Sequence, residues 1–174
     1  MNDAEIRRQP ETLQRIVSDT EALGFNMISE AKVGALLATL AASKPGGRLL
    51  ELGTGTGHGS AWLLAGMDAT STLDTVDTDA RVVAIAKQHL GTDSRVTVHV
   101  MEGAEFIRAA TPGQFDVIYA DTWPGKFNHL DETLGLLRPG GIYVIDDIER
   151  RDEFTSVKLA WASGLMIVVR RASR

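Results

Sequence analysis

Four glycines at alternate positions form the stretch of this sequence best suited to binding a ligand: Gly53, Gly55, Gly57 and Gly59. Glycine adopts positive φ without strain, and because it has no side chain a ligand can touch its backbone. The apolar run 49–52 before them predicts a buried strand, and the run 61–65 after them predicts a helix. Strand, glycine turn and helix in this order are typical of the first unit of a nucleotide-binding α/β domain.

The spacing of the glycines separates two classes of nucleotide site. The dinucleotide fingerprint G-x-G-x-x-G would require glycine at His58 or at Ser60, so an NAD-dependent oxidoreductase is an alternative that the spacing disfavours. With Glu51 in front, the stretch has the pattern E-x-G-x-G-x-G and resembles motif I of the class I S-adenosylmethionine (SAM) methyltransferases. This resemblance implies a Rossmann-like SAM-methyltransferase fold with SAM as the cofactor.

Acidic residues stand at the carboxyl ends of all five predicted parallel strands, which span residues 48–52, 72–77, 95–101, 115–121 and 142–147. In open α/β sheets the ligand binds beyond these strand ends. We therefore expect the strand-end acids to gather around one site: Glu51, Asp77, Glu102, Glu105, Asp121, Asp146 and Asp147.

Individual acids have different expected roles. Asp77 is expected to bind the ribose hydroxyls, since the fold places such a carboxylate about 20 residues after the glycine turn, while Asp79 caps the helix 80–90. Glu51 either holds the cationic end of the cofactor, directly or through water, or supports the loop. Glu105, or the backbone at Ala104, either meets the adenine or only begins a helix.

The other predicted cofactor contacts flank these acids. Trp123 either covers the adenine or packs in the core. His58 is the one histidine inside the glycine loop, and no metal-binding spacing connects the four histidines. The remaining candidates are loop residues and strand-end neighbours: Gly53, Thr54, Gly55, Gly57, Ser60, Asp121, Thr78 and Gly103.

A more specific resemblance begins after the fourth predicted strand. The stretches 119–127, 136–141 and 144–147 are similar to the metal-dependent O-methyltransferases of the catechol and caffeoyl-CoA type, and the likeness covers roughly residues 25–171. That family has an aspartate after strand four, a nearby lysine, an L-x-P-G-G turn and an Asp-Asn pair that ends strand five. Here Asp147 replaces the asparagine, and Gly59 stands where the family has a serine.

This second resemblance implies a metal-assisted reaction. Mg²⁺ or another divalent cation would be held by Asp121, Asp146 and Asp147, and the cation would lower the pKa of a bound hydroxyl. Asp121 and Lys126 are the implied catalytic residues, Lys126 being either the general base or a solvated lysine. The implied activity is O-methylation of a small-molecule hydroxyl. The alternative is a degenerate SAM-fold binding module without catalysis.

The hydrophobic pattern predicts the helices and strands that position these residues. We expect N-terminal helices in residues 1–43, the second of them near 29–43 with Ser29 as its N-cap, followed by an α/β core over 44–174. A helix near 127–137 is expected to end at the turn 138–141, and strands at 154–161 and 165–171 are expected to form a hairpin. The prediction is one domain, 1–174, with helices on both faces of a mainly parallel seven-stranded sheet that ends in an antiparallel hairpin.

The composition of the chain restricts its expected partners and its expected location in the cell. The chain has 174 residues, a formal net charge of -5 and no cysteine, so neither a disulfide nor a thiolate nucleophile is expected, and nucleic acid is not an expected partner. The start of the sequence lacks a signal-peptide pattern and no apolar run is long enough to span a membrane, which predicts a cytoplasmic protein. The short segment 148–153 leaves the predicted pocket either open or completed by a partner subunit in a homodimer.

Overall fold

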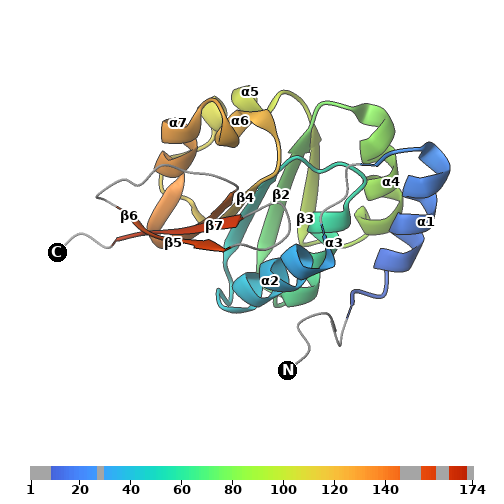
Figure 1. The fold of residues 1–174 in the computed structure, drawn as a ribbon, viewed down its shortest axis with the longest axis horizontal. Coiled ribbons are helices and arrows are strands. Elements are labelled where there is room, and N and C mark those ends of the chain that lie inside the picture. The colour runs from blue at the N-terminus through green and yellow to red at the C-terminus, as the bar shows by residue number, and fades with distance from the viewer. Residues whose placement is uncertain (1–8, 27–29, 146–153, 160–164, 172–174) are drawn as a thin grey trace.

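The structure, a computed structural model, describes residues 9–26, 30–145, 154–159 and 165–171. A seven-stranded sheet with the order β3-β2-β1-β4-β5-β7-β6 runs through it (Figure 1). Its strands are β1 (Arg48–Leu52), β2 (Thr72–Asp77), β3 (Val96–Val100), β4 (Phe115–Ala120), β5 (Leu137–Ile145), β6 (Phe154–Leu159) and β7 (Leu165–Arg170). Pairs among β1 to β5 are parallel, whereas β7 is antiparallel to both β5 and β6. The predicted sheet and its antiparallel C-terminal hairpin are confirmed.

Helices cover both faces of this sheet. One hydrophobic cluster joins it to α1 (Leu13–Leu23), α2 (Ala31–Ala42), α3 (His58–Gly66) and α4 (Ala80–Leu90). A second cluster joins its other face to α5 (Gly103–Ala109) and α7 (Leu130–Gly135), with α6 (Trp123–Lys126) beside them (Figure 1). The layers therefore follow the order helix, sheet, helix, as the sequence predicts.

The central strands are apolar because they are covered on both faces. β1 pairs with β2 on one side and β4 on the other, and Leu49, Leu50 and Leu52 are completely buried. All six residues of β4 are buried as well. The ends of these two strands consequently have a rigid base, which a binding site needs if its geometry is to be defined.

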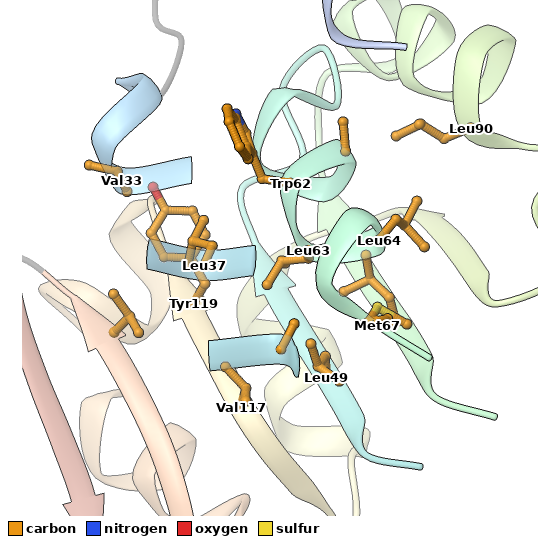
Figure 2. Packing of buried hydrophobic residues seen from close by; sticks show 14 of the residues in the cluster. Val33, Leu37, Leu49, Trp62, Leu63, Leu64, Met67, Leu90, Val117 and Tyr119 are labelled. Atoms are coloured by element: carbon orange, nitrogen blue, oxygen red, sulfur yellow. The ribbon is translucent and has the colours of Figure 1, made fainter. Parts of the chain in front are cut away.

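Close packing between α2 and α3 holds the helix that follows the glycine loop. The indole ring of Trp62 lies so near Gly34 that any Cβ at Gly34 would collide with it. Figure 2 shows Trp62 and Leu63 of α3 beside Val33 and Leu37 of α2. Leu37 and Leu63 are fully buried, and dense packing of this kind resists small shifts of the helix.

Two sequence predictions about element boundaries need correction. The helix predicted near 127–137 is present but shorter: α7 spans Leu130–Gly135 and begins after His129, which has a positive φ of 54°, and the short α6 before it was not predicted. The predicted turn 138–141 lies inside β5 and forms a bulge: β4 advances from Phe115 to Val117 while its partner advances from Leu137 to Ile142. Glycines tolerate the irregular backbone that such a bulge needs.

Other predictions fall at the edges of the described residues. The N-cap of α2 is Glu30, whose backbone is extended, and Ser29, the predicted cap, lies outside the described residues. Asp146 and Asp147 lie outside them too, as does the connection 160–164 between β6 and β7. Among the helices of the described residues, none has the length and apolar character needed to cross a membrane.

Candidate functional site

A cavity of about 570 Å³ opens at the carboxyl ends of β1, β2 and β4. Its size suits a small ligand, and its place is where the sheet order reverses, since β1 connects to β2 on one side and borders β4 on the other. Six residues predicted from the sequence line this cavity: Gly53, Gly55, Asp77, Asp121, Trp123 and Lys126.

The first glycines make a turn that no other residue type would make easily. Gly53 has φ 103°, and a Cβ built on it would lie 3.1 Å from the carbonyl oxygen of Asp121. Gly55 also has a positive φ, 51°. The backbone at this turn therefore reaches the cavity wall without any side chain in the way.

Asp77 bridges the end of β2 to the glycine turn. Its Oδ2 accepts a hydrogen bond of 2.8 Å from the Gly55 amide, and its Oδ1 accepts one of 3.0 Å from the Asp79 amide. Capping of α4 is the role of Asp79, whose carboxylate accepts from the Arg81 amide. Asp77 is thus held by two backbone donors on the cavity wall and remains oriented for a ligand.

Glu51 lies behind the glycine loop rather than on the cavity wall. Its side chain is 1% exposed. Ser60 donates a short hydrogen bond to Glu51 Oε2, and Thr75 donates one of 2.6 Å to the same oxygen. Thr54 and Thr75 share a hydrogen bond of 2.7 Å, in which Thr54 must be the donor because the proton of Thr75 is directed at Glu51.

The protonation of Glu51 follows from its surroundings. The pKa of Glu51 is raised from the ordinary 4.5 to about 8, and burial is the largest cause. The hydrogen bonds from Ser60 and Thr75 lower the pKa by a smaller amount, and the negative charges of Asp121 and Asp77 raise it. The neutral, protonated form of Glu51 is therefore favoured at neutral pH, and both hydrogen bonds end on Oε2. The network joins β1, β2, the loop and α3 without placing a charge inside the protein.

His58 begins α3 and is also inside the protein. It is 7% exposed, and its Nδ1 is buried without a hydrogen-bond partner. Burial lowers the pKa of this imidazole, so the neutral form is favoured. A neutral buried ring at this place is suited to packing against the loop and not to binding an anion by charge.

An aromatic pair forms the outer rim of the cavity. Trp123 and Phe127 are 69% and 63% exposed, and their ring centroids are 5.0 Å apart. The Lys126 ammonium lies 5.2 Å from the Phe127 ring centroid. Tyr143 holds the segment between them by donating a hydrogen bond of 2.5 Å to the carbonyl oxygen of Gly125. Large exposed apolar side chains beside a cavity are typical of ligand-binding surfaces.

Nine other predicted residues, all within the described residues, are not on the wall of this cavity. Five of them belong to the glycine loop and the residues that support it. Gly103 packs against Pro124, and a Cβ built on Gly103 would lie 3.2 Å from the Cβ of Pro124. The nine are Glu51, Thr54, Gly57, His58, Ser60, Thr78, Gly103, Ala104 and Glu105, and Glu102, the other strand-end acid expected at the site, is not on the wall either.

The predicted metal ligands cannot be assembled from the described residues. Asp121 lies on the cavity wall, whereas Asp146 and Asp147 lie outside the described residues. Within the described residues there is no group of three or more histidine, aspartate or glutamate side chains placed to hold a metal ion.

Five cavity residues were not recognised as ligand-binding from the sequence. Asp79, Thr122 and Phe127 adjoin predicted residues along the chain, and Val82 lies in the first turn of α4, so a rule that included the neighbours of predicted residues and the first turn of the next helix would have found them. Phe25 follows α1, far from the other cavity residues in the sequence, and no sequence signal pointed to it.

The fold and the glycine turn define a Rossmann-like α/β protein, and comparison with known proteins gives the family. Residues 50–148 match the family model described as "Methyltransferase domain", and the chain belongs to this family. A curated relative from Mycobacterium avium, named "Putative O-methyltransferase", is 31% identical over 128 residues. One from Mycolicibacterium vanbaalenii with the same name is 32% identical over 128 residues. The first alignment covers 71% of this chain, which spans about 57% of that relative's length.

Solved structures show the same fold. An O-methyltransferase of Bacillus cereus in complex with SAH (S-adenosylhomocysteine) superposes with a TM-score of 0.81 at 18% identity, over 95% of this chain and 93% of that chain. A protein of Klebsiella pneumoniae with an O-methyltransferase name superposes with a TM-score of 0.82 at 21% identity, over 96% and 93% of the two chains. At these identities the likeness establishes the fold.

Proposed function

We propose that this chain is a SAM-dependent methyltransferase that methylates a hydroxyl group of a small molecule. The observation that carries the proposal is the cavity at the strand-order reversal, where Asp77 is held by the Gly55 amide. Membership of the methyltransferase-domain family and relatives named as O-methyltransferases support it. The same membership speaks against an NAD-dependent oxidoreductase.

Charge and shape of the cavity suit the cofactor. The described wall carries three carboxylates, of Asp77, Asp79 and Asp121, and one ammonium, of Lys126. An acidic cavity attracts a cationic ligand, and SAM carries a sulfonium. Asp77 would accept the ribose hydroxyls, and the side-chain-free turn at Gly53 would let the cofactor approach the backbone.

The remaining sequence predictions fit around this arrangement as parts of the proposal. Trp123 would cover the adenine, with the start of α5 close by, because Gly103 contacts Pro124. Thr78, Ala104 and Glu105 would border the same end of the ligand. Glu51, Thr54, Gly57, His58 and Ser60 would act from behind, by holding the loop in its binding shape.

Chemistry at the acceptor needs few groups. SAM, when bound, supplies a methyl group on a positive sulfur, and the protein mainly orients the two reactants. Lys126 Nζ, once deprotonated, is the proposed acceptor of the hydroxyl proton, and Asp121 is the proposed partner of the reacting end of the acceptor. Trp123 and Phe127 offer apolar faces to a ring-shaped acceptor.

A divalent cation is a separate part of the proposal. It is supported by Asp121 at the tip of β4 and by Asp146 and Asp147, which follow β5 in the sequence, since β4 and β5 are parallel neighbours. The described residues alone do not form a metal site, so no step is derived through the ion. We expect EDTA to abolish activity and added Mg²⁺ to restore it. Full activity in EDTA would refute the cation proposal and leave the cofactor proposal unchanged.

Isothermal titration with SAM tests the cofactor proposal. Asp77→Asn should weaken SAM binding about tenfold to a hundredfold, because a hydrogen bond to a charged group contributes about 1.5–3 kcal/mol. Asp74→Asn, on the same strand, is the matched control, since Asp74 pairs with Arg48 and His99 away from the cavity. Absence of SAM binding by the unchanged protein at millimolar concentration would refute the proposal.

Methyl transfer to a panel of catechols and other phenols tests the reaction, with formation of S-adenosylhomocysteine as the readout. Binding of SAM without transfer to any acceptor would favour the non-catalytic binding module. A cytoplasmic location and a homodimer remain predictions from the sequence.

A further inference from the structure

Helix α1 ends at the cavity, although it precedes the α/β core in the sequence. Gly24 terminates α1 with φ 73°, and the amide of Phe25 then donates a hydrogen bond of 3.1 Å to the carbonyl oxygen of Thr20. This turn directs the chain back over the helix end. Phe25 becomes a wall residue of the cavity and lies close to Gly55, where a Cβ would be 3.6 Å from its ring.

A buried polar contact connects α1 to the glycine loop at the neighbouring position. The hydroxyl groups of Thr20 and Thr56 share a hydrogen bond of 2.8 Å, and both side chains are 1% exposed. Thr56 directly follows Gly55, the residue that Phe25 approaches. The Thr20 hydroxyl also contacts the carbonyl oxygen of Ile16 at 2.6 Å, within α1. A hydrogen bond in such a buried place defines the geometry strongly, because leaving the Thr56 hydroxyl unpaired is costly.

A second contact holds α1 against α4, the helix whose first turn borders the cavity. Asp19 and His89 lie 2.7 Å apart, with the His89 side chain 9% exposed. α4 contributes Val82, and its cap Asp79, to the cavity wall. α1 is therefore connected on one side to the loop and on the other to α4, and both of these border the cavity.

Phe25 has no evident role in the hydrophobic core. Among the described residues that make up the two hydrophobic clusters, or pack against them, Phe25 is not included, whereas Leu13 and Ile16 of α1 are. Its ring is half-buried and turned to the cavity. An apolar ring in this position gains most when a ligand covers its exposed side.

We propose that α1 is part of the cofactor site: Phe25 packs on the bound adenosyl cofactor beside Gly55, and the Thr20–Thr56 hydrogen bond sets the position of its ring. The inference rests on the proposed function, because it takes SAM as the occupant of the cavity. It adds a contact from the N-terminal helices to a site otherwise built by strand ends and by the elements that directly follow them.

Titration calorimetry with SAM on the Phe25→Ala variant tests this directly. We expect about tenfold weaker SAM binding, while the melting temperature of the ligand-free protein stays near that of the unchanged protein. Phe25→Tyr keeps the ring and should bind SAM within about twofold of the unchanged protein. Leu23→Ala is the matched control, because Leu23 is 45% exposed on the same helix end and does not line the cavity.

Two further measurements keep the inference open to refutation if Phe25→Ala folds poorly. Thr20→Val should weaken SAM binding in the same direction, and adding it to Phe25→Leu should cost less than the sum of the two single losses. Hydrogen exchange of residues 13–25 in the unchanged protein should slow when SAM is added. Equal SAM affinity of Phe25→Ala and the unchanged protein, strictly additive losses, or exchange that SAM leaves unchanged would each overturn the inference. Failure of the unchanged protein to bind SAM would instead refute the proposed function.

Discussion

Replacing Glu51 by glutamine should remove a large part of the pH dependence of stability. Glu51 is buried, and burial raises its pKa from 4.5 to about 8 in the folded protein. In the unfolded chain the carboxyl is exposed and has its ordinary pKa. Between pH 4.5 and 8 the folded state therefore keeps a proton that the unfolded state has released. Stability must fall as the pH rises through this window.

The magnitude follows from the two pKa values. Each pH unit over which only the folded state is protonated costs 1.36 kcal/mol. Between pH 5 and pH 9 the Glu51 contribution to the free energy of unfolding should decrease by about 4 kcal/mol. Glutamine keeps the shape and an oxygen acceptor for Ser60 and Thr75 but has no proton to lose.

Urea unfolding of both proteins at five pH values and constant salt measures this difference. All other titrating groups are common to the two proteins, so subtraction isolates Glu51. We expect the stability of the unchanged protein relative to Glu51→Gln to be highest at pH 5, to fall through pH 8 and then to level off. Parallel curves over the whole range would show that Glu51 is ionised in the folded state and that the proposed neutral network is wrong.

Two further substitutions test the supports of the cavity. Gly59→Ala should destabilise the protein by about 1–3 kcal/mol, because a Cβ there collides with Glu51 Oε1; Gly135→Ala, where a Cβ meets nothing within 4 Å, is the control, and equal melting temperatures for the two variants would contradict this packing. Tyr143→Phe should cost about 1–3 kcal/mol in urea unfolding, because it leaves the Gly125 carbonyl without its buried donor; an unchanged midpoint would exclude this role.

The parallel core was predictable because its signals are local. The central strands β1 and β4 are mainly apolar, as strands buried on both faces must be. An acid stands at or beside the end of β1, β2 and β4: Glu51, Asp77 and Asp121. Asp79 was recognised as the cap of α4 from its place before an amphipathic run, and it does accept from the Arg81 amide. Of the strand-end acids expected to gather at one site, Asp77 and Asp121 do line the cavity, and parallel topology alone places them at one edge.

The region after β4 was less predictable because its structure depends on tertiary pairing. Leu136 and Leu137 fit a helical period, but Leu137 pairs with Phe115 and begins β5. Pro139 and Gly140 then form a bulge inside the strand, where the sequence pattern predicts a helix stop. Periodicity cannot distinguish these outcomes, since the decisive contact comes from a residue of another strand.

The position of Phe25 was unpredictable for a related reason. Its approach to Gly55 depends on Gly24, which turns the chain, and on a hydrogen bond between Thr20 and Thr56. No local pattern encodes a contact between residues so far apart in the chain. Such contacts are nevertheless the ones that convert an open strand edge into a walled cavity.

Motif I can be explained by this geometry as a structural unit rather than as a row of ligand contacts. Gly53 and Gly55 line the cavity. Glu51 and Ser60 are hydrogen-bonded to each other behind it, and Gly59 leaves room for the Glu51 carboxyl. A larger residue at position 59 would push either the acid or α3 away. The loop keeps its shape because a neutral acid, two threonines and a serine satisfy one another beneath it, and Asp77 can then meet the Gly55 amide at the cavity edge.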